Sequence, residues 1–409
     1  MKQKRFTLLV SLFLCIFANE ASAYDAEVDG IYYIFSGSNA TVTYFLNGTN
    51  NTPIYTGDVV IPESVTYNGT TYKVTAIGHW AFQYCTRLRS VTLPSSVTSF
   101  GNYAFCHCDS LASYKIPASI KTVGMYAFSE CHGLQSIEIP NSVTSIGIYA
   151  FQNCTTLASV TIPDSMTAIN SYTFTGCSGL KEVFIPNSVT SIGVKAFEKC
   201  TSLASVTIPE SVTSIGNDAF NGCSGLTSVS IPGSVTSLGD RAFSGCSSLK
   251  SVILPYGVKT IGGGAFSLCS ALTEVSIPSS VTSIGGAAFG GGCTNLTTVK
   301  VDIATPLTIN KYTFVNRANA TLYVPKGCRS VYEKAEYWKE FHKIAEIVNA
   351  DINGDNEISI ADCSALVNIV LGADDQEPYL YDHELADING DGSITIADVT
   401  ALVNIILGK

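Results

Sequence analysis

The stretch IPNSVTSIGVKAFEKCTSLASVT, residues 185–207, decides the fold because it recurs along most of the chain. A Cys returns every 23 residues from Cys85 to Cys269 and once more at Cys293, after one inserted Gly. A Phe stands three residues before each of these Cys residues, a Leu stands three residues after it, and most units have a Pro at their second position. No single unit can bury its own apolar side chains, so a fixed period of this length predicts a solenoid of about ten stacked turns.

Two strands are expected in each unit. Leu157 to Ile162 alternates apolar and hydroxyl side chains, which is the pattern of a half-buried strand, and Pro163 ends it. Residues 189–192 are predicted to form a second short strand that ends at Gly193. The A-F-x-x-C segment is predicted to form a tight helical turn. The predicted fold class is mainly β, a parallel solenoid roughly 47 Å long at the spacing of neighbouring strands.

From Val74 to Val299 the repeated unit resembles the BspA-like leucine-rich-repeat proteins of bacterial surfaces. Residues 29–33 and 67–72 resemble the N-terminal hairpin cap of that family. Residues 320–327, with a helix expected around Tyr332 to Phe341, resemble its closing cap. Caps are also expected physically, since each end of a stack exposes raw core and an unpaired sheet edge. The resemblance implies an adhesin or a protein-binding scaffold.

The regular cysteines are open to three interpretations. Stacked thiols lie about 4.8 Å apart with parallel Cβ directions, whereas a disulfide needs about 3.8 Å between Cβ atoms, so buried free thiols are favoured over disulfides. Cys106, His107 and Cys108 with Cys131 and His132 suggest a zinc cluster. A zinc site is disfavoured because Cys108 and Cys131, which belong to the regular series, are expected to face the core. The side chains of the two histidines are expected to point away from each other.

One column of residues on the predicted solenoid is a candidate ligand surface. The residue before each A-F or T-F pair is aromatic in the first five units, and stacking would align these side chains as an aromatic strip along one edge. Such a strip either anchors a ligand or packs adjacent turns. Exposed Ser and Thr on the sheet face offer a second surface. The aromatic strip is Trp80, Tyr103, Tyr126, Tyr149 and Tyr172, and the column continues as Lys195, Asp218, Arg241, Gly264 and Ala287.

The acidic C-terminal segment is a duplicated calcium loop. Residues 351–362 recur 36 residues later as 387–398, and residues 350–409 hold twelve acidic residues against one basic residue. Calcium takes six to eight oxygens, which a 12-residue loop supplies from positions 1, 3, 5, 7, 9 and 12. The predicted ligands for two ions are Asp351, Asn353, Asp355, Glu357 (backbone carbonyl), Ser359 and Asp362, then Asp387, Asn389, Asp391, Ser393 (backbone carbonyl), Thr395 and Asp398.

A helix is expected after each loop, and the pair from Asp351 to Lys409 resembles a type I dockerin more closely than an EF-hand pair. No clear entering helix precedes either loop, and position 12 is Asp rather than Glu. The resemblance implies docking to a cohesin module on a partner protein. The residues at the recognition positions are more apolar than is usual in that family, so a divergent cohesin or another module is expected. The docking surface would comprise Ile360, Ala361, Val367, Asn368, Ile396, Ala397, Val403 and Asn404.

The N-terminal residues resemble a secretion signal. Lys2, Lys4 and Arg5 precede an apolar run of 13 residues, and Ala21-Ser22-Ala23 supplies a cleavage pattern. Cys15 lies inside that run and does not follow a small residue, so lipidation is disfavoured. The run is too short for a bilayer span, and no later one is long enough. A net charge of -10 argues against nucleic-acid binding.

These observations predict a secreted or cell-surface bacterial protein without catalytic activity. The domains are expected to be a signal peptide at 1–23, an N-terminal β cap at 24–75, repeats at 76–300, a closing cap at 301–349 and a dockerin at 350–409. The solenoid would bind a host or bacterial surface protein or a glycan. One alternative is an accessory component of polysaccharide degradation. A weaker one is a glycoside hydrolase, which lacks a recognisable carboxylate pair in this sequence.

Overall fold

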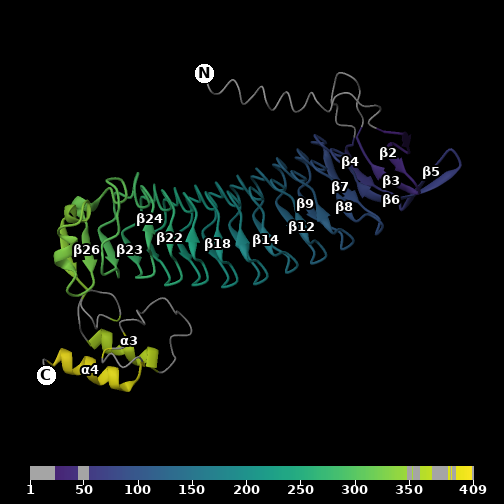
Figure 1. The fold of residues 1–409 in the computed structure, drawn as a ribbon. Coiled ribbons are helices and arrows are strands. Elements are labelled where there is room, and N and C mark those ends of the chain that lie inside the picture. The colour runs from purple at the N-terminus through teal and green to yellow at the C-terminus, as the bar shows by residue number, and fades with distance from the viewer. Residues whose placement is uncertain are drawn as a thin grey trace, which may run out of the picture.

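A computed structural model describes residues 24–44, 55–347, 352, 360–370, 386, 388 and 393–407. Residues 1–23, which were interpreted as a signal peptide, lie outside this set. Figure 1 shows one long coil of parallel strands, with two helices in the C-terminal segment. The predicted fold class is confirmed: the chain is mainly β, it forms a parallel solenoid, and helices occur where the dockerin-like module was expected.

Each unit contributes its Ser-Val strand to one parallel series. Most neighbours in the series pair with a shift of 23 residues, so that Ser159 of one unit lies beside Glu182 of the next, and Val160 lies beside Val183. The series is β7 (Leu88–Thr92), β9 (Ser113–Lys115), β11 (Ser136–Glu138), β13 (Ser159–Thr161), β15 (Glu182–Phe184), β17 (Ser205–Thr207), β19 (Ser228–Ser230), β21 (Ser251–Ile253), β23 (Glu274–Ile277) and β25 (Thr298–Val301).

A second series of two-residue strands runs along another side of the coil with the same 23-residue register, as in Ile192 beside Ile215. Its apolar residue points into the core and its first residue points out. The series is β8 (Ser99–Phe100), β10 (Thr122–Val123), β12 (Ser145–Ile146), β14 (Ala168–Ile169), β16 (Ser191–Ile192), β18 (Ser214–Ile215), β20 (Ser237–Leu238), β22 (Thr260–Ile261) and β24 (Ser283–Ile284).

The solenoid has about twelve turns rather than the expected ten, because both flanks continue the coil without carrying the repeat motif. On the N-terminal side, β3 pairs in parallel with β6 and β4 pairs in parallel with β7, while β1–β2, β2–β3 and β5–β6 pair antiparallel. The strands of this flank are β1 (Ala26–Val28), β2 (Ile31–Ser36), β3 (Asn39–Val42), β4 (Gly57–Val60), β5 (Ser64–Tyr67) and β6 (Thr70–Ile77).

On the C-terminal side, β26 and β27 extend the parallel sheet beyond β25. The helix expected around Tyr332 to Phe341 is instead two short pieces, since Tyr337 takes a left-handed backbone conformation between them. The elements of this flank are η1 (Arg317–Asn319), β26 (Thr321–Val324), α2 (Arg329–Tyr332), η2 (Trp338–Glu340) and β27 (Lys343–Glu346).

The core is a stack of identical side chains. Phenylalanine rings from Phe82 to Phe314 lie one above another with centroids 5.0–5.5 Å apart and nearly parallel planes. Tyr55 covers the first ring and Trp338 the last, at 4.8 and 5.5 Å. The flanks therefore bury the two faces of the ring stack that the repeats alone would leave open.

The A-F-x-x-C segment is a pair of tight turns and not the expected helical turn. In one unit the amide of Gln152 donates to the carbonyl of Tyr149, and the amide of Cys154 donates to the carbonyl of Phe151. Tyr149 and Asn153 have left-handed backbone conformations, with φ of 62° and 55°. Two such residues in every unit prevent a continuous helix, because right-handed helix requires negative φ throughout.

The C-terminal module has its own small core. Helices α3 (Ile360–Val370) and α4 (Ile396–Ile406) enclose a cluster that is separate from the solenoid core. Its buried apolar members include Ala365 and Leu366 of α3 and Leu402 of α4. Thr395 begins α4 with a capping box, in which its hydroxyl accepts from the amide of Ala397 and the carboxylate of Asp398 accepts from the amide of Thr395.

Candidate functional site

The regular cysteines are buried free thiols, as the spacing predicted. From Cys108 to Cys293 each thiol donates to the carbonyl of the Phe one unit earlier; for example, Cys131 Sγ lies 3.0 Å from the oxygen of Phe105. That oxygen also accepts from the amide of Cys108 within its own turn. The thiols therefore supply a second donor to buried carbonyls, and they act structurally.

Burial keeps these thiols protonated. It raises the pKa of Cys131 well above its ordinary value of 9.0, that of Cys223 to about 12 and that of Cys293 to about 11. A group whose pKa is raised by folding stabilises the fold fully below its unfolded pKa, and that contribution is lost as the pH rises toward the folded value. We expect the melting temperature to fall progressively between about pH 9 and pH 12, a window set by those pKa values.

The measurement is thermal unfolding across that range, together with thiolate absorbance of the folded chain. Titration of the buried thiols near pH 9 in the folded chain would contradict this assignment.

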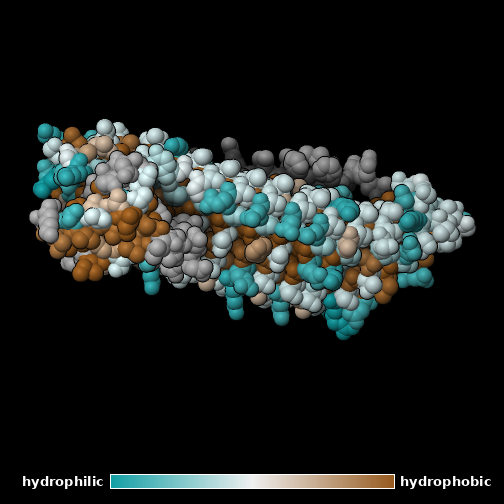
Figure 2. All heavy atoms as spheres, turned by 90° about the horizontal axis from the view of Figure 1, so that it is seen from below, coloured by the Kyte–Doolittle hydropathy of each residue, from teal (hydrophilic) through white to brown (hydrophobic). Residues whose placement is uncertain are grey.

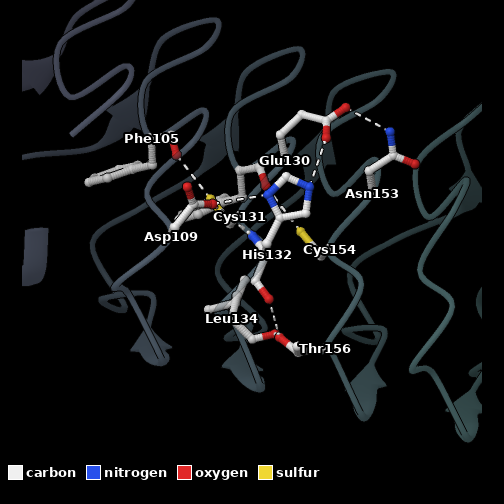
Figure 3. Close-up of polar contacts among 10 residues, drawn as sticks. Phe105, Asp109, Glu130, Cys131, His132, Leu134, Asn153, Cys154 and Thr156 are labelled. Atoms are coloured by element: carbon white, nitrogen blue, oxygen red, sulfur yellow. Dashed lines mark hydrogen bonds and ion pairs between the residues drawn. The ribbon is translucent and has the colours of Figure 1, made fainter. Parts of the chain in front are cut away.

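The residues of the suggested zinc cluster form a network of polar side-chain contacts instead. Figure 3 shows His132 between two carboxylates: Nδ1 lies 3.0 Å from Asp109 Oδ1, and Nε2 lies 3.2 Å from Glu130 Oε2. Asn153 donates to the other oxygen of Glu130 at 2.6 Å. The expected divergence of the histidines is wrong, since the rings of His107 and His132 have centroids 6.3 Å apart. Within the described residues no group of three or more His, Cys, Asp and Glu side chains has a metal-binding arrangement.

The aromatic strip forms a continuous stack. Centroid separations are 4.6 Å for Tyr103–Tyr126, 4.5 Å for Tyr126–Tyr149 and 4.4 Å for Tyr149–Tyr172. Lys195 Nζ lies 5.9 Å from the last ring, over its face, and Trp80 lies 6.4 Å from the first tyrosine. The faces of the tyrosine rings are covered by neighbours, so only their edges and hydroxyls reach solvent.

Every strip residue has a left-handed backbone conformation, with φ between 57° and 62°. A non-glycine residue in that region costs on the order of 1 kcal/mol. Mutual stacking offsets part of this cost. Five consecutive units thus hold large aromatic side chains where Gly264 stands in a later unit, which makes this edge a distinct surface of the molecule.

The sheet face formed by β9 to β21 is an open surface. Its outward residues are mostly Ser and Thr, with ion pairs such as Lys115–Glu138 at 2.7 Å. Phe184 and Ile253 are its exposed apolar residues. This face offers hydroxyls and two apolar contacts to a partner.

The calcium module is described in part. Asp362 and Asp398, the predicted last ligands of the two loops, are completely buried at equivalent positions at the starts of α3 and α4. The Asp362 carboxylate accepts from the amide of Ile352, the second residue of its loop, at 2.7 Å. Buried carboxylates at the mouth of an oxygen-rich loop suit a bound cation. Of the other predicted ligands, Ser393 and Thr395 are described, whereas Asp351, Asn353, Asp355, Glu357, Ser359, Asp387, Asn389 and Asp391 lie outside the described residues.

The predicted docking surface is largely solvent-exposed. Ile360 and Ile396 hold equivalent positions in the two helices and are 76% and 67% exposed. Figure 2 shows hydrophobic residues gathered over α3 and α4. Ala361, Ala397, Val403 and Asn404 are exposed as well, while Val367 and Asn368 are half-buried. The exposed isoleucines at equivalent points of the two helices, with the exposed Val403, Ile405 and Leu407 of the C-terminal helix and the residue after it, offer apolar side chains to a protein partner.

Sequence reasoning missed one buried charge cluster. Asp218 is buried and accepts from Arg241 Nε at 2.8 Å and from Asn221 Nδ2 at 2.8 Å. The residues Asp218 and Arg241 are 23 apart, so the period itself could have indicated the contact. No helix among the described residues is long and apolar enough to cross a membrane.

Comparison with known proteins identifies both parts of the chain. The BspA type leucine rich repeat region matches residues 63–181, 98–227 and 167–297. Together these matches span more than half of the chain. Residues 349–407 match the dockerin type I domain. None of the curated proteins matches the chain.

Two solved structures illustrate the likeness. A leucine-rich repeat protein from Bacteroides ovatus ATCC 8483 is 26% identical with a TM-score of 0.63, and the match covers 78% of this chain and 88% of that one. A leucine rich cell surface protein from Faecalibacterium prausnitzii A2-165 is 27% identical with a TM-score of 0.41, and the match covers 69% and 96%.

Proposed function

The chain belongs to the BspA-type leucine-rich repeat family, and from this premise we propose that it is a secreted or cell-surface binding protein without catalytic activity. Its solenoid binds a protein partner, and its dockerin binds two calcium ions and docks to a cohesin-like module. The observation that carries the proposal is the joining of a repeat solenoid to a duplicated loop-helix module. Both kinds of module are typically non-catalytic and are typical of extracellular or cell-surface bacterial proteins.

Calcium binding is supported by the buried positions of Asp362 and Asp398. Each would supply carboxylate oxygens to the ion of its loop, and the remaining oxygens would come from the other predicted ligands, Ser393 and Thr395 among them. Bound calcium would neutralise part of the negative charge of these carboxylates. The acidic loops repel themselves without it, so the helices are expected to need calcium to pack.

Docking is supported by the apolar patch around Ile360 and Ile396. Cohesin-like partners would contact this patch through apolar side chains, because its exposed residues offer few charges. Secretion is supported by the basic residues, the apolar run and the Ala21-Ser22-Ala23 pattern within residues 1–23.

A role as an accessory component of polysaccharide degradation is the second candidate, since dockerins tether proteins to assemblies. The geometry of the aromatic strip favours a protein contact over a glycan, because stacked ring faces are closed to sugar rings and only their edges are free. On the open sheet face, Phe184 and Ile253 offer two further apolar contacts to a protein.

The test uses the chain from residue 24 onward, immobilised and exposed to envelope proteins of the source bacterium. Capture should require calcium and be lost on adding a chelator. The double change Ile360→Asp and Ile396→Asp should reduce capture at least about tenfold while leaving calcium affinity unchanged. Val60→Asp, an equally exposed change on the N-terminal flank of the solenoid, is the matched control. If the amount of captured protein changes neither on adding the chelator nor in the double variant, docking through this module is ruled out.

A further inference from the structure

The tyrosines of the aromatic strip are near copies of one another, each shifted by one turn of the solenoid. They share one backbone conformation, and their ring planes differ by only 4° for Tyr103 with Tyr126 and by 9° for Tyr126 with Tyr149. A simple shift separates each ring atom from its counterpart by the distance between the centroids, which is 4.6 and 4.5 Å for these two pairs. The ring carbons ortho to the hydroxyls therefore line up in columns, each with a close neighbour in the next turn.

The ortho carbons are the positions at which oxidised tyrosines join. When a phenol loses one electron and one proton, the unpaired electron of the radical is shared by the oxygen, the para carbon and the ortho carbons. The para carbon already bears Cβ, so two such radicals couple mainly through their ortho carbons. Free tyrosines must first meet, whereas the strip holds its rings side by side beforehand. The χ2 torsion of tyrosine is soft, so neighbouring rings can turn until their ortho carbons bond.

The strip is open to an oxidant although the ring faces are covered. Its tyrosines are half-buried, and the ring edges that carry the hydroxyl and the ortho carbons reach solvent. Trp80 is 40% exposed and continues the stack at 6.4 Å from Tyr103. Electrons can therefore be withdrawn from these rings at the surface of the folded chain.

The thiols of the same turns compete little for an oxidant. Oxidants attack the thiolate form of cysteine. Burial raises the pKa of Cys131 well above its ordinary value and that of Cys106 to about 12, so both stay protonated. The described cysteines that are not buried are Cys328 and Cys363, and both lie outside the turns of the strip. An oxidant at this edge of the solenoid therefore takes electrons from the aromatic rings.

We propose that the aromatic strip is a cross-linking site, at which a one-electron oxidant such as a haem peroxidase with hydrogen peroxide joins tyrosines of adjacent turns as dityrosine. Each of two phenols gives up one electron and its hydroxyl proton. The two radicals form one carbon–carbon bond between ortho carbons, and the hydrogen on each of these carbons moves to the ring oxygen, which restores both phenols. The two hydrogen atoms lost reduce one molecule of hydrogen peroxide to two molecules of water.

The stack itself selects the pairs that join. Tyr126 has a nearly parallel tyrosine on each side, whereas the plane of Tyr172 is turned by 26° from that of Tyr149. Lys195 Nζ also lies 5.9 Å from the centroid of Tyr172, where its positive charge opposes the loss of an electron. The main product is therefore Tyr126 joined to Tyr103 or to Tyr149. Such a bond closes a loop between adjacent turns and restricts the unfolded chain, as a disulfide does.

The test treats residues 24–409 with a haem peroxidase and hydrogen peroxide at low protein concentration, after alkylation of the two half-exposed cysteines. The blue fluorescence of dityrosine should appear in the monomer band of a denaturing gel, since the joined rings belong to one chain. Mass spectrometry should find two strip tyrosines in one joined peptide pair that has lost two hydrogen atoms. Tyr24 and Tyr32, with centroids 4.7 Å apart and planes at 80°, would give a different peptide pair.

The decisive variant carries Tyr126→Phe and Tyr172→Phe. It keeps the stacked rings, but it leaves Tyr103 and Tyr149 without a tyrosine in an adjacent turn. The yield of dityrosine from the strip should fall about tenfold or more, because the remaining phenols are no longer held side by side.

The matched control carries Tyr256→Phe and Tyr312→Phe. These residues are 60% and 57% exposed, and within the described part of the chain neither has a tyrosine ring in contact. The control should leave the yield from the strip unchanged. An oxidised chain without dityrosine in the strip, dityrosine confined to covalent dimers, or a strip yield that the decisive variant does not lower would each overturn the proposal.

Discussion

Replacing Phe174 by alanine is expected to lower the free energy of unfolding by about 3–5 kcal/mol. Phe174 is completely buried in the middle of the ring stack, with Phe151 and Phe197 each 5.4 Å away. Its neighbours are fixed by strand pairing on both sides, so the cavity can collapse only a little. Urea unfolding followed by circular dichroism measures the loss.

Phe184→Ala is the matched control. Phe184 is 66% exposed on β15, in the same unit, and its truncation should change the free energy of unfolding by no more than about 0.5 kcal/mol. Stability in a repeat stack is nearly a sum of terms between neighbouring turns, so Phe174→Ala should also broaden the transition as the two halves unfold separately. Equal losses for the two variants would show that the ring stack is not the core of the fold.

Changing Asp362 or Asp398 to Asn is expected to weaken calcium binding at its own loop by roughly 100-fold or more, since a charged oxygen ligand is lost at a buried position. Calorimetric titration of calcium into the chelator-treated chain measures this. Each single variant should retain one strong site, and the double variant should retain none.

Ser364→Ala is the control for this series. The Ser364 hydroxyl donates to the carbonyl of Ile360 within α3, on the same helix but outside the loop. It should leave both sites intact. Undiminished calcium affinity in the double Asp variant would show that these two carboxylates are not calcium ligands.

Much of the solenoid could be predicted because its contacts repeat with the period. Side chains 23 residues apart occupy the same position in adjacent turns and can therefore touch. This holds for the pairs Asp218–Arg241, Asp109–His132 and Glu130–Asn153. The buried thiols follow from the same rule, since stacking fixes their separation and direction.

The remaining features depend on geometry that the period does not encode. The flanks add turns without the motif, because pairing to β7 and β25 needs only an extended chain with apolar residues at alternate positions. His132 turns toward His107 because Asp109 and Glu130 hold its two nitrogens. The faces of the aromatic rings are covered by neighbouring rings, because the same left-handed backbone conformation in successive turns gives the side chains the same direction. Patterns of residue type locate these positions, whereas side-chain direction comes only from the folded chain.

The most direct test of the account is scanning calorimetry of residues 24–409 with calcium and with a chelator. Two transitions are expected: a large one from the solenoid that calcium does not move, and a small one from the dockerin that disappears when calcium is removed. A single transition, or a pair of transitions that are both insensitive to the chelator, would contradict the claim that a calcium-dependent docking module is joined to an independently stable binding solenoid.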